Sequence, residues 1–211
     1  MRFIEVLCEG SSHVPATREV LTRRFKLIEG EDFRIHPHRG KGKLPLPGHQ
    51  LKTPERGDES LLAQLPIKLK NMGPQTQGGF EVAVVVGVDA DDDDCRQLKQ
   101  SLVDLYTALP TKPPRVLFRI AVEETESWFI ADTSAVRAAY RHADVAILGN
   151  HAPDAVCGAW ELLAECLGDA PGACRGREKT EWATAISPHL DLDKPKSPSF
   201  AALIRGIAKI V

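Results

Sequence analysis

Five aspartates follow the most hydrophobic stretch of the chain, in EVAVVVGVDADDDDC at residues 81–95. Residues 82–88 are all apolar or small, as is typical of a strand buried on both faces. Asp89, Asp91 and Asp92–Asp94 come directly after it. Carboxylates this close repel one another unless a cation or water offsets their charge. Because Mg²⁺ and Mn²⁺ prefer clustered carboxylate oxygens, the stretch indicates a divalent metal site.

Two other predicted strands also end in acidic residues. The stretch RFIEVLCEG (2–10) ends with Glu9 and Gly10, and VLFRIAV (116–122) is followed by Glu123, Glu124 and Glu126. In an open parallel sheet, functional groups gather beyond the carboxyl ends of the strands. We therefore expect these carboxylates to meet the aspartates at one edge of the sheet.

The individual acids have different expected roles. Asp92–Asp94 precede a predicted helix, where acidic side chains stabilise the N-terminal end of the dipole, so we expect them to cap it or face solvent. Asp89 and Asp91 are the expected metal ligands, followed by Glu126 at the start of the helical ESWFIAD and then by Glu123. Glu124 is expected to face solvent.

The elements that carry these residues predict an α/β fold. Strands are expected at 2–10, 32–38, 82–88 and 115–122, and they alternate with helical patterns at 11–28, 59–72, 98–109 and 126–132. This alternation predicts a mostly parallel sheet with helices on both faces. After residue 133 only helical patterns occur, in 155–167, 179–190 and 198–211. We expect an α/β core over residues 1–132 and a helical extension over 133–211 that packs on it.

A basic loop lies between the second strand and the helix at 59–72. Its cations are expected to bind nucleic-acid phosphates without reading bases: Arg39, Lys41, Lys43, Lys52 and Arg56, within residues 39–58. The alternative is an exposed loop kept soluble by its charges.

Composition limits the class of protein. The 211 residues have a formal net charge of −2, with 43% hydrophobic and 27% charged residues, which is ordinary for a soluble globular domain. The five cysteines form no CxxC pair, which argues against a disulfide framework or structural zinc. The sequence begins without a signal-peptide pattern and has no run long enough to span a bilayer, so we expect a cytoplasmic protein that does not enter membranes.

The acidic strand ends EGSS (9–12), VDAD (88–91) and EETESW (123–128), in this order, resemble the Toprim domain of topoisomerases, primases and OLD-family nucleases. More closely, the chain is similar to a small bacterial Toprim-like family of uncharacterised proteins, often encoded beside AAA or ABC-type ATPases. Further motifs that match this family span most of the chain: Gly40-Lys41-Gly42, Glu126-Ser127-Trp128 through Ala131-Asp132, Lys179, and Ser199-Phe200.

The resemblance implies a nuclease that hydrolyses phosphodiester bonds of DNA or RNA with Mg²⁺ or Mn²⁺, in a phage-defence system with an ATPase partner. One or two ions would be held by Asp89 and Asp91 with Glu126 or Glu123. Glu9 would be a ligand or the general acid/base, and Lys179 would neutralise phosphate charge.

The sequence departs from the family at one position. The family commonly has an acidic residue where this chain has His13, shortly after Glu9-Gly10. His13 could replace that acid as a ligand or proton carrier, or be a tolerated substitution.

The departure favours a first alternative, a Toprim-like sensor or adaptor subunit of an ATPase complex without hydrolytic activity. A second alternative is a small-molecule phosphatase or phosphotransferase of the haloacid-dehalogenase type, with Asp89 as nucleophile. A third is a nuclease of the PIN type, which also clusters acids.

Overall fold

The computed structural model of the protein describes residues 2–45, 57–73, 76–77, 80–155, 158–170 and 176–211. Its centre is a sheet in which four strands run parallel, in the order β2 (Phe33–Pro37), β1 (Arg2–Cys8), β4 (Phe80–Asp89) and β5 (Arg115–Ala121). The two-residue strand β3 (Thr76–Gln77), which the sequence did not predict, pairs antiparallel with β4. The expected α/β fold with a mostly parallel sheet is confirmed.

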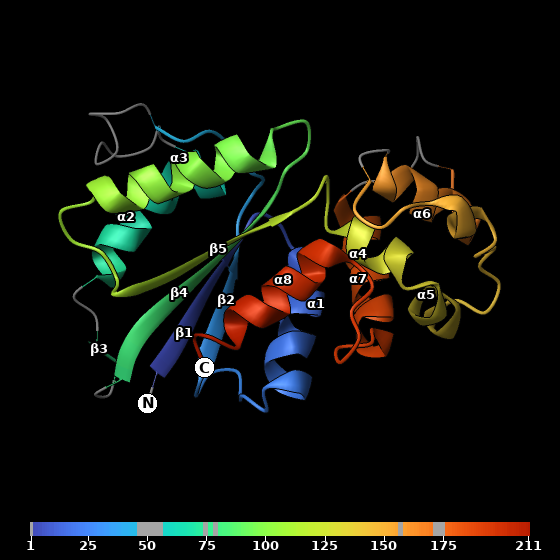
Figure 1. Ribbon diagram of the computed structural model, residues 1–211, viewed down its shortest axis with the longest axis horizontal. Coiled ribbons are helices and arrows are strands. Elements are labelled where there is room, and N and C mark those ends of the chain that lie inside the picture. The colour runs from blue at the N-terminus through green and yellow to red at the C-terminus, as the bar shows by residue number, and fades with distance from the viewer. Residues whose placement is uncertain (1, 46–56, 74–75, 78–79, 156–157, 171–175) are drawn as a thin grey trace.

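Helices cover both faces of the sheet, as predicted (Figure 1). On one face lie α2 (Leu61–Met72) and α3 (Cys95–Ala108), and on the other α1 (His13–Glu19) and α8 (Pro198–Ile207). A π-helical turn, η1 (Val20–Arg24), continues α1, where the sequence predicted a single regular helix.

The alternation of side chains along β4 explains why its whole length is hydrophobic. Val82, Val84, Val86 and Val88 pack with leucines of α2 and α3, whereas Ala83 and Val85 belong to the core on the other face. Since successive side chains of a strand point to opposite faces, only a continuous apolar run can fill both cores.

The remaining helices gather beyond the carboxyl ends of the strands (Figure 1). They are α4 (Glu126–Ala131), α5 (Thr133–Ala139), α6 (Ala159–Leu167) and α7 (Gly176–Ile186), with the 3-10 turns η2 (Ile147–Asn150) and η4 (Ser187–His189). No strand occurs after residue 133 in the part of the chain that the structure describes. These helices and turns therefore pack beside the carboxyl ends of the strands, where the acidic residues lie.

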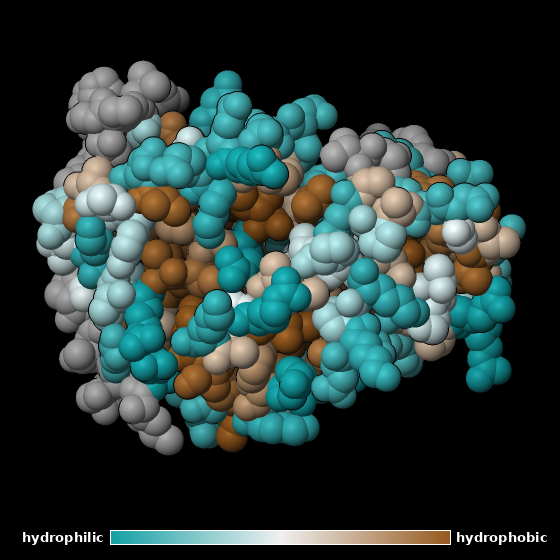
Figure 2. All heavy atoms as spheres, in the orientation of Figure 1, coloured by the Kyte–Doolittle hydropathy of each residue, from teal (hydrophilic) through white to brown (hydrophobic). Residues whose placement is uncertain are grey.

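The surface in Figure 2 is mainly hydrophilic over α3 and α8, with hydrophobic side chains between them along β5. Three apolar residues of β5 are half-buried: Val116 and Ile120 pack on the core that includes α2 and α3, and Leu117 packs on the core of the other face. None of the described helices has the length and hydrophobicity needed to cross a membrane.

Candidate metal centre

Backbone hydrogen bonds hold the three acidic strand ends together. Glu9 N donates to Gly87 O at 3.1 Å, and Asp91 N donates to Glu123 O at 2.8 Å. The side chain of Glu9 folds back over β4, where its Oε2 accepts a hydrogen bond of 3.0 Å from Asp89 N. The predicted meeting of the first and third acidic strand ends with the aspartates is thus present in the fold.

His13 completes a compact group with Glu9 and Asp89. It is the first residue of α1 and is 1% exposed, and its Nε2 lies 2.9 Å from Asp89 Oδ1. Thr125 Oγ1 donates a hydrogen bond of 3.0 Å to the same oxygen, Asp89 Oδ1. One ligand atom from each of Glu9, His13 and Asp89 lies within 4.8 Å of the others.

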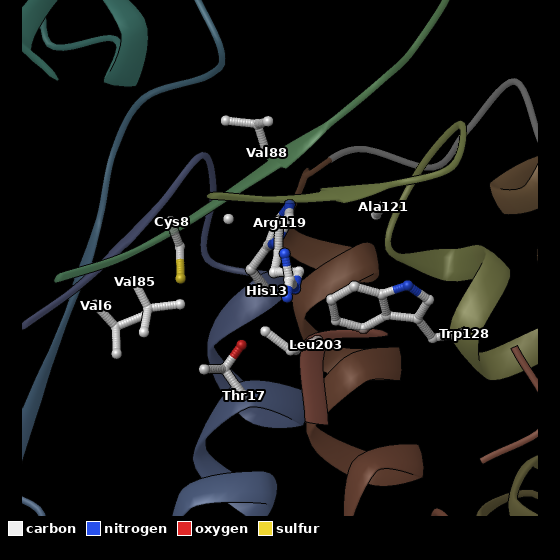
Figure 3. A pocket seen from close by; sticks show the side chains of 11 residues that line it. Val6, Cys8, His13, Thr17, Val85, Val88, Arg119, Ala121, Trp128 and Leu203 are labelled. Carbon is white, nitrogen blue, oxygen red and sulfur yellow. The ribbon is translucent and has the colours of Figure 1, made fainter. Parts of the chain in front are cut away.

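The imidazole of His13 lies between Trp128 and a small cavity (Figure 3). Its ring meets Trp128 edge to face, with centroids 6.0 Å apart. His13, Cys8 and Arg119 are among the residues that line a cavity of about 10 Å³. This volume holds about one water molecule. A Cβ at Gly87 would lie 3.5 Å from His13 Nδ1, an ordinary van der Waals contact, so the imidazole lies directly against this strand.

Burial and mutual repulsion perturb the acids of this group. Burial, with the charge of Asp89, raises the pKa of Glu9 from 4.5 to about 7. Burial likewise raises the pKa of Glu126 from 4.5 to about 7, although Lys179 opposes the shift. For His13, burial favours the neutral imidazole, but the nearby carboxylates of Asp89, Glu9 and Glu126 outweigh it and raise the pKa. The site carries more negative charge than its own residues neutralise.

Lys179, on α7, lies beside the carboxylates of Glu124 and Glu126. Its ammonium donates to Glu124 Oε1 at 2.9 Å, lies 4.0 Å from Glu126 Oε2, and stands over the ring of Trp160 at 5.1 Å. The expectation that Glu124 faces solvent was wrong, because this ion pair and the adjoining helices leave its side chain 17% exposed. Lys179 is itself 24% exposed, so it belongs to the site rather than to the outer surface.

Two of the predicted metal ligands point elsewhere. Asp91 is 47% exposed and its carboxylate contacts Lys41 at 2.7 Å. Glu123 is buried, and its Oε1 accepts hydrogen bonds from Gly158 N and, at 3.2 Å, from Ala159 N at the start of α6. Asp91 and Glu123 both have a positive φ, 47° and 62°, which turns each side chain out of the direction that an extended strand end would give it.

The basic loop is described only in part. Arg39 is 85% exposed and paired with Glu59 at 2.8 Å, Lys43 is exposed, and Lys41 binds the acidic loop after β4. Lys52 and Arg56 lie outside the described residues. Nucleic-acid binding by this loop stays a prediction.

The acids of the helix start behave as expected. Asp94 caps α3 by accepting hydrogen bonds from Arg96 N and Gln97 N, at 2.9 and 2.8 Å. Asp92 and Asp93 are exposed. Of the five aspartates at the end of β4 and directly after it, only Asp89 joins the buried group of Glu9 and His13.

The donors of the group fit a divalent cation. Two carboxylates and an imidazole converge, and Glu126, 1% exposed, has an Oε1 atom without a hydrogen-bond partner among the described residues. A buried carboxylate oxygen without a partner is costly, and a bound cation would remove that cost. Carboxylates suit Mg²⁺ and Mn²⁺, whereas imidazole suits the transition metals, so the mixed set favours Mn²⁺ over Mg²⁺.

From the sequence, functional roles were expected for Glu9, Asp89, Glu126 and Lys179, but only a possible role for His13. The available signal was its position four residues after Glu9, at the start of a helix. Side chains of the first helical turn point toward the N-terminal end, which here faces the strand edge.

The position of Glu123 predicts a structural role, because its Oε1 accepts two backbone hydrogen bonds at the start of α6. Replacing Glu123 with Ala removes the acceptor for two backbone N–H groups at the start of α6, so we expect a loss of about 1–3 kcal/mol in the free energy of unfolding. Urea unfolding measures this loss, and Mn²⁺ titration of the folded variant should give the wild-type affinity. If Glu123→Ala instead binds Mn²⁺ about tenfold more weakly and loses no stability, Glu123 is a metal ligand.

Comparison with known proteins places the chain in a family by sequence. The model of DUF4276, a domain of unknown function, matches residues 8–208. No curated protein and no solved structure gives a significant match. The matched segment contains the group of Glu9, His13 and Asp89 and also Glu126 and Lys179.

Proposed function

We propose that this chain, which belongs to the DUF4276 family, is a metal-dependent nuclease that hydrolyses phosphodiester bonds of DNA or RNA. The observation that carries the proposal is the convergence of Glu9, His13 and Asp89 at the carboxyl edge of a parallel sheet, from the segment that joins the end of β1 to the start of α1 and from the end of β4. Functional sites of such sheets lie at this edge.

Each residue has a role in the proposal. Glu9, His13 and Asp89 hold one Mn²⁺ or Mg²⁺ ion, with Glu126 as a further ligand. When bound, the ion polarises a phosphate and lowers the pKa of a water molecule. Thr125 orients Asp89 through the hydrogen bond to Oδ1, and Lys179 offsets the charge of Glu124 and of the incoming phosphate.

Proton transfer has a candidate within the same group. A general acid or base works best when its pKa lies near the working pH, and the carboxyl of Glu9 has a pKa of about 7 before a cation binds. Glu9 therefore suits both roles that the sequence left open, metal ligand and general acid or base. Loss of the bound ion when Glu9 is replaced would indicate a ligand, whereas loss of hydrolysis with the ion still bound would indicate a proton carrier.

The relation to Toprim domains and the ATPase partner belong to the same proposal. Three acidic strand ends in the Toprim order support the first, since they meet at one edge. An ATPase partner and phage defence follow from the family resemblance alone. The sensor or adaptor role is the second candidate, favoured by His13 in place of an acid.

The test is hydrolysis by the purified full chain. Single-stranded and double-stranded DNA, RNA, bis(p-nitrophenyl) phosphate and the phosphomonoester p-nitrophenyl phosphate are incubated with Mn²⁺, with Mg²⁺ or with EDTA. The nuclease requires cleavage with metal and none with EDTA. Mn²⁺ binding without cleavage of any substrate would support the adaptor instead. Hydrolysis of a phosphomonoester in preference to the diesters would contradict both and favour a phosphatase.

A further inference from the structure

Lys41 is the most completely bound cation on the acidic edge. Its ammonium lies 2.7 Å from Asp91 Oδ2, 2.9 Å from Asp93 Oδ2, 2.9 Å from Ala90 O and 3.3 Å from Asp89 O. An ammonium has three N–H donors, and the three nearest of these oxygens satisfy all of them. Although it belongs to a glycine-containing loop, the side chain is only 14% exposed.

The backbone that carries Lys41 is fixed on both sides. Gly40 N donates to Glu9 O at 3.0 Å, and Lys41 O accepts from Leu62 N at 2.8 Å. Gly42 has a φ of 67°, and a Cβ there would lie 1.9 Å from Ser60 Oγ, so the loop can pass the start of α2 only with glycine at this position. The ammonium is therefore placed by the fold and not by a freely moving surface chain.

The oxygens around the ammonium are also fixed. Asp91 has a φ of 47°, and its N–H bonds to Glu123 O, which ties this loop to the end of β5. Asp93 N bonds back to Ala90 O at 2.9 Å. Two carboxylates and two carbonyl oxygens that converge in this way make the ligand set of a hard divalent cation.

We propose that the Lys41 ammonium occupies a second cation position of the acidic edge, so that the metal centre beside it takes a single divalent ion. Asp91 is then the partner of an internal cation and no ligand of the ion at Glu9, His13 and Asp89. The two positions are adjacent, because Asp89 supplies its side chain to one and its carbonyl to the other.

An ordinary surface ion pair does not account for this arrangement. Exposed lysine–carboxylate pairs contribute little and leave most of the ammonium in water. Here two backbone carbonyls complete the coordination, and water reaches only a small part of the side chain. The inference uses the metal centre of the proposed function but does not require hydrolysis.

The test counts bound Mn²⁺ per chain by equilibrium dialysis. Wild type should bind one ion, and Lys41→Ala should bind two, because the vacated oxygens accept the second. The double variant Lys41→Ala/Asp91→Asn should return to one ion. Lys43→Ala, an exposed lysine of the same loop, is the matched control and should bind one ion like wild type.

Two results would overturn the inference. One is a Lys41→Ala protein that folds, as judged by circular dichroism, and still binds a single ion. The other is the loss of an ion from Asp91→Asn alone, which tests the inference even if Lys41→Ala does not fold. If wild type binds no ion, the proposed function fails, whereas one ion gained by Lys41→Ala and lost in the double variant would still support the cation position.

Discussion

Asp89→Asn should abolish metal-dependent phosphodiester hydrolysis and weaken Mn²⁺ binding by about 100-fold or more. The substitution keeps the shape of the side chain and removes its charge, while Asp89 contacts both His13 Nε2 and Thr125 Oγ1. None of the four aspartates that follow β4 lies in the group of ligand atoms that the structure brings together. Initial rates with bis(p-nitrophenyl) phosphate and Mn²⁺ titration measure the two effects.

The acidic run supplies a matched control for this variant. Asp92→Asn makes the same chemical change three residues away, at an exposed position, and should leave both rate and affinity within about twofold of wild type. Equal losses in the two variants would mean that the run acts only through its overall charge. Unchanged hydrolysis in Asp89→Asn would reject the metal centre as the catalytic site.

The metal-free protein should lose stability as the pH rises from 4.5 to about 7. Glu9 and Glu126 keep protons in the folded state that they release when unfolded, since their folded pKa of about 7 exceeds 4.5. The stability linked to each carboxyl is present below pH 4.5 and is lost as the pH passes the folded pKa. A shift of this size corresponds to about 3 kcal/mol for one group, or a Tm lower by about 6–12 °C in a chain of this length.

Mn²⁺ should reverse this loss, because the ion binds the deprotonated carboxylates. The rise in Tm on adding Mn²⁺ should be larger above pH 7 than near pH 5, as differential scanning calorimetry can measure. Glu126→Gln removes one of the two titrating carboxyls and should flatten the pH profile of the metal-free protein. A Tm that stays constant between these pH values in EDTA would show that neither carboxyl is perturbed.

The fold was predictable because its signals are local. The valine-rich stretch needs apolar neighbours on both faces, and the core supplies them from α2 and α3 on one side and α1 on the other. Helical and strand patterns alternate up to residue 132, which leaves few arrangements besides a parallel sheet. The strand β3 and the π-helical turn at Val20–Arg24 were not predicted, since two residues carry no period and a π-turn differs from an α-helix only in its hydrogen bonds.

The sequence by itself predicted that Glu9 and Asp89 lie at the same edge of the sheet, because parallel strands bring their carboxyl ends to one edge. The structure makes them neighbours by pairing β1 with β4. Only the tertiary structure decided which neighbouring acids join them. Positive φ angles turn Asp91 toward Lys41 and Glu123 toward α6, while the start of α1 brings in His13 and α7 brings in Lys179. A strand fixes where a residue stands, but the direction of a side chain in a loop depends on contacts with segments far away in the sequence.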